Sequence, residues 1–282
     1  NDDDGFEWFG GAVGAKWLVS AFNKDDAFDY DFGWEGKGQF WFVIQGTDEA
    51  DNAGEHDGSK PDDASPFSNP TIFNVTYIGS GVDAATKNST ALHFRDNTGG
   101  TYANSIFTDF AKHAIEVEDL PAASGTDSRQ RMEAGDLKLM NNIWFGFGSG
   151  DQLSAGANGI IRATDGAEDP DAQFLVDHLG GNGNSLENPM LRGISRTTDG
   201  GLDPLPKAGS PVYNNVAERP NDNWFLDAPY KGAFSSKNWA LGWTAVDANG
   251  YFGNVTNQVT IKDENLSGDA TWTNDNVYLL DG

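Results

Sequence analysis

The chain has 282 residues, with 43 acidic side chains against 18 Lys and Arg, and its formal net charge is −25. This charge disfavours DNA, RNA and anionic lipid as partners. Cysteine is absent, which excludes disulfides and thiolate chemistry, and no apolar run is long enough to span a membrane. Nine Trp, 18 Phe, seven Tyr and 35 Gly favour an ordered, secreted all-β protein over a disordered chain.

The first 50 residues contain an internal repeat. Asp3–Glu7 (DDGFE) returns 22 residues later as Asp25–Asp29 (DDAFD). Each copy is followed by a Gly-rich turn and an apolar run, Trp17–Val19 and Phe40–Ile44. A period of this length with short strands is typical of a β-solenoid, in which equivalent residues of successive coils stack. An ordinary pair of hairpins is the alternative.

Further short strands follow the repeat. Residues 71–78, 91–94, 102–110 and 114–117 are rich in β-branched and aromatic residues, and turn residues separate them. These segments are predicted to form successive coils. Asn104 lies at a strand end, where solenoids often stack Asn side chains, although a plain surface Asn is the alternative.

We expect residues 1–253 to form one β-solenoid domain. Within it, residues 118–222 are predicted to be loop-rich, with short helices in 129–140 and 171–179. Residues 223–247 form an aromatic-rich closing segment. Residues 254–282 read as an extended C-terminal strand segment, which pairs with a neighbouring subunit or opens a further module.

Several segments resemble a known kind of protein module. They are residues 3–11 (DDGFEWFGG), 15–19, 25–34, 38–40, 65–69, 71–78, 102–107, 230–234 and 239–244. They are similar to a module of large secreted surface proteins of Bacteroidetes and marine bacteria. The resemblance implies a right-handed parallel β-helix-like solenoid and an extracellular, cell-surface location, and it carries no assigned activity. Two departures stand out. The half that usually precedes residues 3–11 is missing, and residues 270–282 resemble the opening of such a module.

Two acidic groups accompany the repeat and are the candidate metal site. The groups are Asp2, Asp3, Asp4 and Glu7, and Asp25, Asp26, Asp29 and Asp31. If the coils stack in register, equivalent carboxylates approach to about 5 Å, and a cation relieves their repulsion. Ca²⁺ suits such a site because it accepts six to eight oxygen ligands in flexible geometry. Solvated turn carboxylates are the alternative, and the later acidic stretch at residues 48–63 is predicted to be a solvated loop.

The aromatic residues are candidates for sugar binding as well as for the core. Trp8, Trp34 and Trp41 are the predicted sugar-stacking residues, with simple packing as the alternative. No catalytic residue is assigned, because among 43 acids some pair meets any distance criterion by chance. The positive charges near the predicted strands show no spacing that selects a set: Lys16, Lys37, Arg95, Lys112 and His113.

These features favour an extracellular structural or adhesive protein that self-associates, as a head-to-tail fibre subunit or as one segment of a tandem array. The predicted assembly residues are Trp272, Val277, Tyr278, Leu279 and Leu280, because an added strand bonds to an open sheet edge. The alternative is an extracellular carbohydrate-binding or polysaccharide-degrading β-helix protein, a lyase or a hydrolase, whose partner is a glycan.

Overall fold

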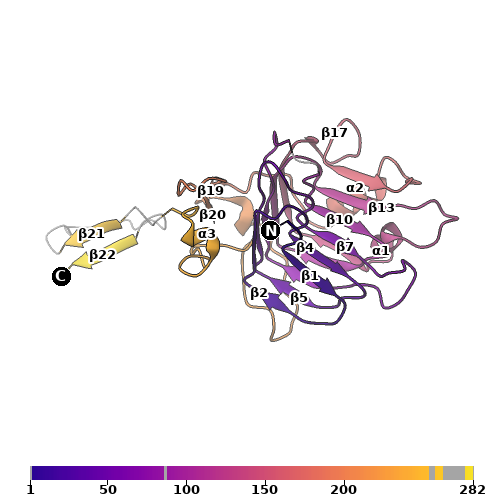
Figure 1. Cartoon of the computed structure of the whole chain (residues 1–282), viewed down its shortest axis with the longest axis horizontal. Coiled ribbons are helices and arrows are strands. Elements are labelled where there is room, and N and C mark those ends of the chain that lie inside the picture. Colours follow the sequence, from indigo (N-terminus) through magenta and orange to yellow (C-terminus); the bar gives the residue numbers. More distant parts are fainter. Residues whose placement is uncertain (1, 86–87, 254–257, 263–276, 282) are drawn as a thin grey trace.

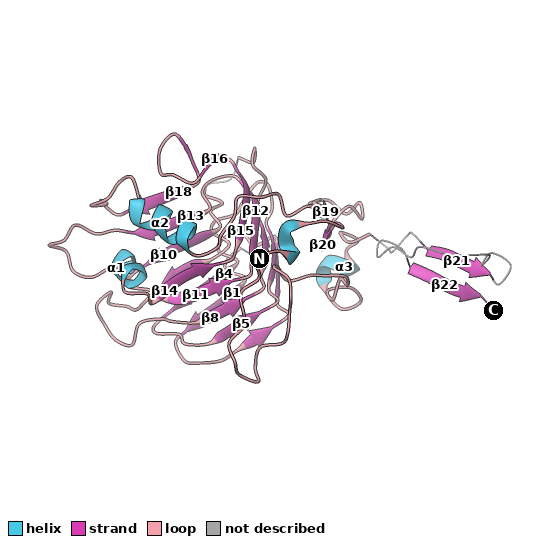
Figure 2. Cartoon of the chain, turned by 180° about the vertical axis from the view of Figure 1, so that it is seen from behind, coloured by secondary structure: helices cyan, strands magenta, loops and turns pink. Residues whose placement is uncertain are grey.

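The computed structural model describes residues 2–85, 88–253, 258–262 and 277–281. Most of the chain winds into stacked parallel strands, and long loops project from the strand ends (Figure 1). The same stack is seen from behind in Figure 2, where short helices lie at its margins. Within the described residues, no helix combines the length and the apolar character needed to cross a bilayer.

Three sheets form the sides of the stack. Sheet A contains, in spatial order, β1 (Phe6–Phe9), β4 (Phe28–Asp31), β7 (Glu55–Asp57), β10 (Leu92–Arg95), β13 (Ile115–Glu118) and β18 (Ile161–Thr164). Sheet B contains β2 (Ala15–Lys16), β5 (Lys37–Gln39), β8 (Thr71–Phe73), β11 (Gly100–Ala103) and β14 (Leu137–Met140). Sheet C contains β3 (Val19–Ala21), β6 (Phe42–Ile44), β9 (Thr76–Ile78), β12 (Ile106–Phe110), β15 (Ile143–Phe147), β16 (Gly150–Gln152) and β17 (Asn158–Gly159).

Each coil supplies one strand to each sheet, in the order A, B, C. Phe6 pairs with Phe28 in sheet A, and Ala15 pairs with Gly38 in sheet B, both in parallel register. Phe6 and Phe28 are equivalent positions of the two sequence copies, and the pairing in sheet B is shifted from the repeat by one residue, because Ala15 and Gly38 are 23 residues apart. The repeat in the sequence is therefore the coil itself, and the expected all-β parallel β-helix solenoid is confirmed.

Stacked aromatic side chains fill the interior. The ring of Phe28 stacks on that of Phe6 at 5.4 Å and on that of Trp41 at 4.6 Å. Gly38 makes room for this arrangement, because a Cβ atom there would lie 2.6 Å from the Trp41 ring. In-register stacking therefore builds the core as columns of like side chains.

The corner between sheets B and C has the same backbone conformation in five coils. Trp17, Phe40, Asn74, Asn104 and Asn141 all have φ between 51° and 59°. Asn adopts this left-handed conformation more readily than other non-glycine residues do. Asn104 is buried, so the alternative of a plain surface Asn is wrong, and the place of Asn at this corner has a backbone cause.

The corner side chains also bind a later part of the chain. The Asn104 amide donates to Ala217 O at 2.9 Å and accepts from Ala217 N at 2.8 Å. Asn74 donates to Tyr230 O, and Gln39 exchanges two hydrogen bonds with the backbone of Leu226. This pairing ties residues 215–230 across the coils.

The remaining elements cover the sides and one end of the solenoid. They are α1 (Ser128–Glu133), α2 (Gln173–Gly181), β19 (Leu191–Gly193), β20 (Asp203–Pro206), the 3-10 helix η1 (Pro211–Tyr213) and α3 (Ala245–Ala248). Leu175 and Leu179 of α2 are buried in the core, and His178 Nε2 accepts a hydrogen bond from Leu139 N of β14. Helix α2 therefore closes the end at the fifth coil. The expected helix in 171–179 is present, whereas the one in 129–140 ends at Glu133 because Leu137–Met140 joins sheet B.

The aromatic closing segment packs along the side of the solenoid. Phe234 lies edge-on to Phe42 of β6 at 5.1 Å, and Phe252 also contacts the outer face of sheet C. Farther along, β21 (Gln258–Lys262) pairs in parallel with β22 (Val277–Asp281). Both views place this pair beyond the solenoid (Figures 1 and 2). Trp272 lies outside the described residues.

Replacing Asn104 separates its two roles. Asn104→Gly retains the left-handed backbone but loses both side-chain hydrogen bonds to Ala217, so we expect a loss of about 1–2 kcal/mol in the free energy of unfolding. Asn104→Ala also strains the backbone and should lose about 1 kcal/mol more. Urea unfolding measures both. Two variants as stable as the native chain would contradict the role assigned to this corner.

Candidate active face on sheet A

The outer face of sheet A carries two adjacent columns of ionisable side chains. The strand register aligns the first column as Glu7, Asp29, Glu55, His93, Glu116 and Arg162. In the second column, Asp31, Arg95 and Glu118 lie on β4, β10 and β13, and Asp57 of β7 is the register partner of Arg95. At about 4.8 Å per strand, the first column spans about 24 Å.

Arg95 is the centre of a charge network on this face. Its guanidinium donates to Asp57 Oδ1 at 2.6 Å and to Glu55 Oε2 at 2.9 Å. Burial raises the pKa of Glu55, but the interaction with His93, whose Nδ1 lies 3.8 Å from Glu55 Oε1, and the charge of Arg95 outweigh burial and lower it. Glu55 is therefore held ionised.

Asp29, the register neighbour of Glu55, has the opposite environment. Its Oδ1 atom is buried and has no hydrogen-bond partner. Burial, and then the charges of Glu55 and Asp57, raise the pKa of Asp29 to about 8. Two carboxyl groups on adjacent strands thus differ in protonation near neutral pH, with Asp29 neutral and Glu55 charged.

The predicted metal residues divide into two sets. Asp3, Asp4 and Asp25 bring ligand atoms within 4.8 Å of one another, and so do Asp4, Glu7 and Asp29. Five carboxylates thus gather at the β1 edge of sheet A, around the shared Asp4.

The other three predicted ligands are engaged elsewhere. Asp2 forms an ion pair with Lys24 at 2.9 Å. Asp26 is buried and accepts a hydrogen bond from Asn52 N at 2.7 Å, and Asp31 accepts one from Phe32 N. The structure does not bring these three side chains into the two groups.

The donor chemistry of the five-carboxylate group fits Ca²⁺. All ligand atoms are hard oxygens, which Ca²⁺ prefers. Burial is the largest cause that raises the pKa of Asp4 to about 6, and the neighbouring negative charges raise it further. A backbone hydrogen bond from Asp26 has the opposite effect. A bound divalent cation would relieve this repulsion.

The sugar-stacking expectation is wrong for two of its three tryptophans. Trp34 and Trp41 are fully buried, and their indole N–H groups donate to Val13 O and Ala15 O. Trp8 is partly buried and stacks on Trp34 and Trp41 at the end of the core. Packing inside the solenoid explains all three.

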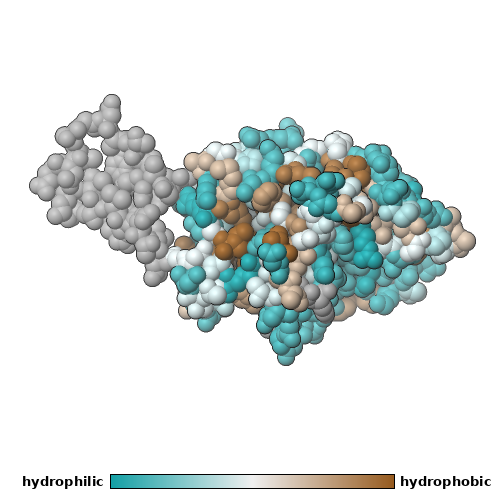
Figure 3. All heavy atoms as spheres, turned by 90° about the horizontal axis from the view of Figure 1, so that it is seen from above, coloured by the Kyte–Doolittle hydropathy of each residue, from teal (hydrophilic) through white to brown (hydrophobic). Residues whose placement is uncertain are grey.

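The surface in Figure 3 is mostly hydrophilic, with small hydrophobic clusters near its middle.

One comparison with known proteins identifies the family. A family model described as a pectate-lyase-like β-helix domain matches residues 1–188. The chain belongs to this family. No curated protein and no solved structure matches the chain significantly.

The β-helix domain has candidate residues that the sequence did not single out. Glu55 and Asp57 lie on β7 of the β-helix, so the prediction of a solvated loop over residues 48–63 is wrong for them. Arg95 was one of several positive charges with no distinguishing spacing. Loops of different length separate the coils, so the step along the chain from Asp29 to Glu55 is shorter than the step from Glu55 to His93. No regular interval in the sequence therefore marks this column.

The raised pKa of Asp29 makes the stability of the β-helix depend on pH. From pH 4 to about 8 the unfolded chain ionises Asp29 while the folded chain holds it protonated, so stability falls as pH rises through this window. Asp29→Asn removes this contribution. We expect the stability of the variant relative to the native chain to rise by about 4 kcal/mol between pH 5 and pH 8, measured by urea unfolding.

Ca²⁺ should raise the unfolding temperature of the native chain at pH 8 more than at pH 5, where protons compete for Asp4. Asp177→Asn, an exposed position on α2, is the matched control. It should change neither the pH dependence of stability nor the effect of Ca²⁺ on the unfolding temperature. A native chain with the same pH profile as Asp29→Asn would contradict the assignment.

Proposed function

We propose that the protein is an extracellular glycan-binding and glycan-cleaving β-helix that works on the outer face of sheet A. The observation that carries the proposal is the in-register pair Asp29 and Glu55, whose pKa values are shifted in opposite directions. Membership of a pectate-lyase-like β-helix family supports a polysaccharide as the ligand.

The two carboxyl groups suit acid and base roles in glycoside hydrolysis. Asp29 holds a proton near neutral pH and donates it to the oxygen of the leaving sugar. Glu55 is ionised and attacks the anomeric carbon as that bond breaks. Water then replaces Glu55 at the anomeric carbon and gives its proton back to Asp29. The spacing of adjacent strands, about 4.8 Å, is closer to the carboxyl separation of retaining hydrolases, about 5–5.5 Å, than to that of inverting ones.

The charge of the face selects the substrate class. Arg95 is already paired with Asp57 and Glu55, and Arg162 lies 3.7 Å from Glu116, so the positive charges on this face are balanced by carboxylates. The acidic residues then disfavour uronate polymers. We propose a neutral polysaccharide as the substrate, and Ca²⁺ at Asp3, Asp4 and Asp25 as a structural ion beside the site.

A panel of neutral and uronate polysaccharides tests this function. Reducing ends should appear with a neutral polymer, and NMR should show retained anomeric configuration. Asp29→Asn and Glu55→Gln should each lower kcat at least about 100-fold, since each removes one half of the acid–base pair. Azide should restore cleavage by Glu55→Ala, because it replaces the missing nucleophile.

Asp177→Asn serves again as the control outside the face. Cleavage that is unaffected by both carboxyl substitutions, or a uronate polymer as the preferred substrate, would contradict the proposal.

We also propose a second role, self-association into a cell-surface assembly. The observation that favours it is the parallel pair β21 and β22, in which Gln258 is the register partner of Val277. The offset between these partners along the chain is close to the offset between Phe6 and Phe28, which are partners in the first two coils. Parallel strands that pair at such an offset are the building unit of a solenoid.

A further inference from the structure

Phe145 on β15 is an aromatic side chain on the outer face of sheet C. Its neighbour Trp144 lies in the core and stacks on Phe107 at 4.3 Å, and adjacent residues of a strand point to opposite faces. Elsewhere on this outer face, the closing segment packs on β6 and β9, and η1 packs on β12 and β15. Phe145 is left 38% exposed.

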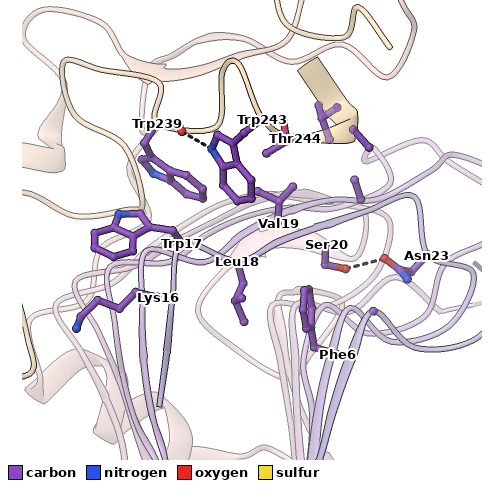
Figure 4. A pocket seen from close by; sticks show the side chains of 14 residues that line it. Phe6, Lys16, Trp17, Leu18, Val19, Ser20, Asn23, Trp239, Trp243 and Thr244 are labelled. Carbon is purple, nitrogen blue, oxygen red and sulfur yellow. Dashed lines mark hydrogen bonds between the residues drawn. The ribbon is translucent and has the colours of Figure 1, made fainter. Parts of the chain in front are cut away.

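A groove of about 560 Å³ lies over Phe145. Strands β12 and β15 line it, together with Val82 and with residues 188–196, which include β19 (Figure 2). A different groove, of about 930 Å³, lies beside the first coil, between residues 16–21 and the side chains of Trp239 and Trp243 (Figure 4). The groove over Phe145 lies within the stack, because β12 and β15 both have strand neighbours on either side.

Asp109 holds the two walls of the groove over Phe145 in place. Its Oδ2 atom accepts from Arg196 Nη2 at 2.6 Å, and its Oδ1 atom accepts from Val82 N at 3.3 Å. Arg196 also donates to Gln45 O at 3.1 Å and to Gly79 O at 3.2 Å, which follow β6 and β9. One guanidinium thus anchors the segment beside the groove across three coils. A groove that is fixed before a ligand arrives loses little conformational entropy on binding.

The charges beside the groove are balanced. Arg196 pairs with Asp109 at 2.6 Å, and Arg192 Nη1 lies 3.8 Å from Asp203 Oδ2. Because each arginine already has a carboxylate partner, the groove favours a neutral ligand over a charged one.

The lining matches the two kinds of surface on a sugar ring. Phe145, Val82 and Ile194 offer exposed apolar surface, which suits the face of C–H groups on a pyranose. The Oδ1 atom of Asn188 accepts from Met190 N at 2.7 Å, which holds the amide in place, and its NH₂ group can donate to a sugar hydroxyl. The volume lies in the range of small-ligand sites, about 300–1,000 Å³.

A peptide strand does not suit this groove. β12 lies between β9 and β15, and β15 lies between β12 and β16. These two strands therefore offer no sheet edge for strand addition, and the groove must bind its ligand through side chains. A sugar needs only an apolar ring face and side-chain hydrogen bonds.

We propose that the Phe145 groove, lined by Val82, Thr108, Phe145, Asn188 and Ile194, is a second binding site for a neutral polysaccharide, in which the ring of Phe145 stacks on one sugar unit. This inference rests on the proposed function for the class of ligand but not for cleavage. Sheets A and C form different sides of the solenoid. A polymer bound at Phe145 therefore stays attached while the outer face of sheet A acts on another part of it, which raises the effective concentration of substrate there.

Binding by a cleavage-deficient chain tests the site. Each variant is made in the Glu55→Gln chain, the parent, and its binding to soluble galactomannan, arabinoxylan and mixed-linkage β-glucan is measured by affinity gel electrophoresis. Phe145→Ala should weaken binding to the polymer that the parent binds on the order of tenfold, because a stacking contact is lost. Phe145→Tyr retains the ring and should bind as the parent does.

Tyr213→Ala is the matched control. This aromatic side chain on η1 is 44% exposed and does not line the groove, so its removal should leave binding unchanged. Thermal unfolding confirms that every variant is folded.

Equal binding by Phe145→Ala and the parent, or an equal loss in Tyr213→Ala, would overturn the assignment of the groove alone. Failure of the parent to bind any of the polymers would overturn both this site and the glycan ligand of the proposed function. Binding that depends on Phe145, in a chain whose native form cleaves none of the polymers, would support the groove and overturn the hydrolase proposal.

Discussion

The constraint on which the structure depends is in-register stacking of parallel coils. Each strand lies about 4.8 Å from its equivalent in the next coil, so every position in the repeat becomes a column of side chains. Inward columns give the stacked rings around Phe28 and Trp41. Outward columns on sheet A bring ionisable groups together whether or not their charges are compatible. Where charges alternate, as at Asp57 and Arg95, an ion pair forms. Where they repeat, as at Asp29 and Glu55, one carboxyl must stay protonated or a cation must bind.

The proposed chemistry follows from that conflict. A surface of solvated carboxylates would have ordinary pKa values and no distinct acid and base. Stacking one carboxyl beside another, and binding only one of them to Arg95 and His93, separates their protonation states. The same repulsion, carried to the β1 edge around Asp4, produces the group suited to Ca²⁺. The proposed acid–base pair and the proposed cation site are thus two results of one stacking rule.

The sequence predicted the architecture because the first two coils are nearly equal in length. The repeat at Phe6 and Phe28 makes the period visible, and the apolar runs after it mark sheets B and C. The later columns were hidden, since loops of variable length lie between Glu55 and His93. The sequence pattern also did not predict that Trp34 and Trp41 are both buried, because the geometry of the coil turns both side chains into the core. The acidic repeat was recognised as a unit, but hydrogen bonding removes Asp26 and Asp31 from it.

The most direct test of this account is the titration of individual carboxyl groups, observed by ¹³C NMR in the folded chain with Asp and Glu side chains labelled and with Asp29→Asn and Glu55→Gln used for assignment. The account predicts that the carboxyl resonance of Asp29 titrates near pH 8 while that of Glu55 titrates below its ordinary value. An Asp29 resonance that titrates close to the ordinary value of 3.8 would contradict it, because the pair would then hold two equivalent charges and no acid.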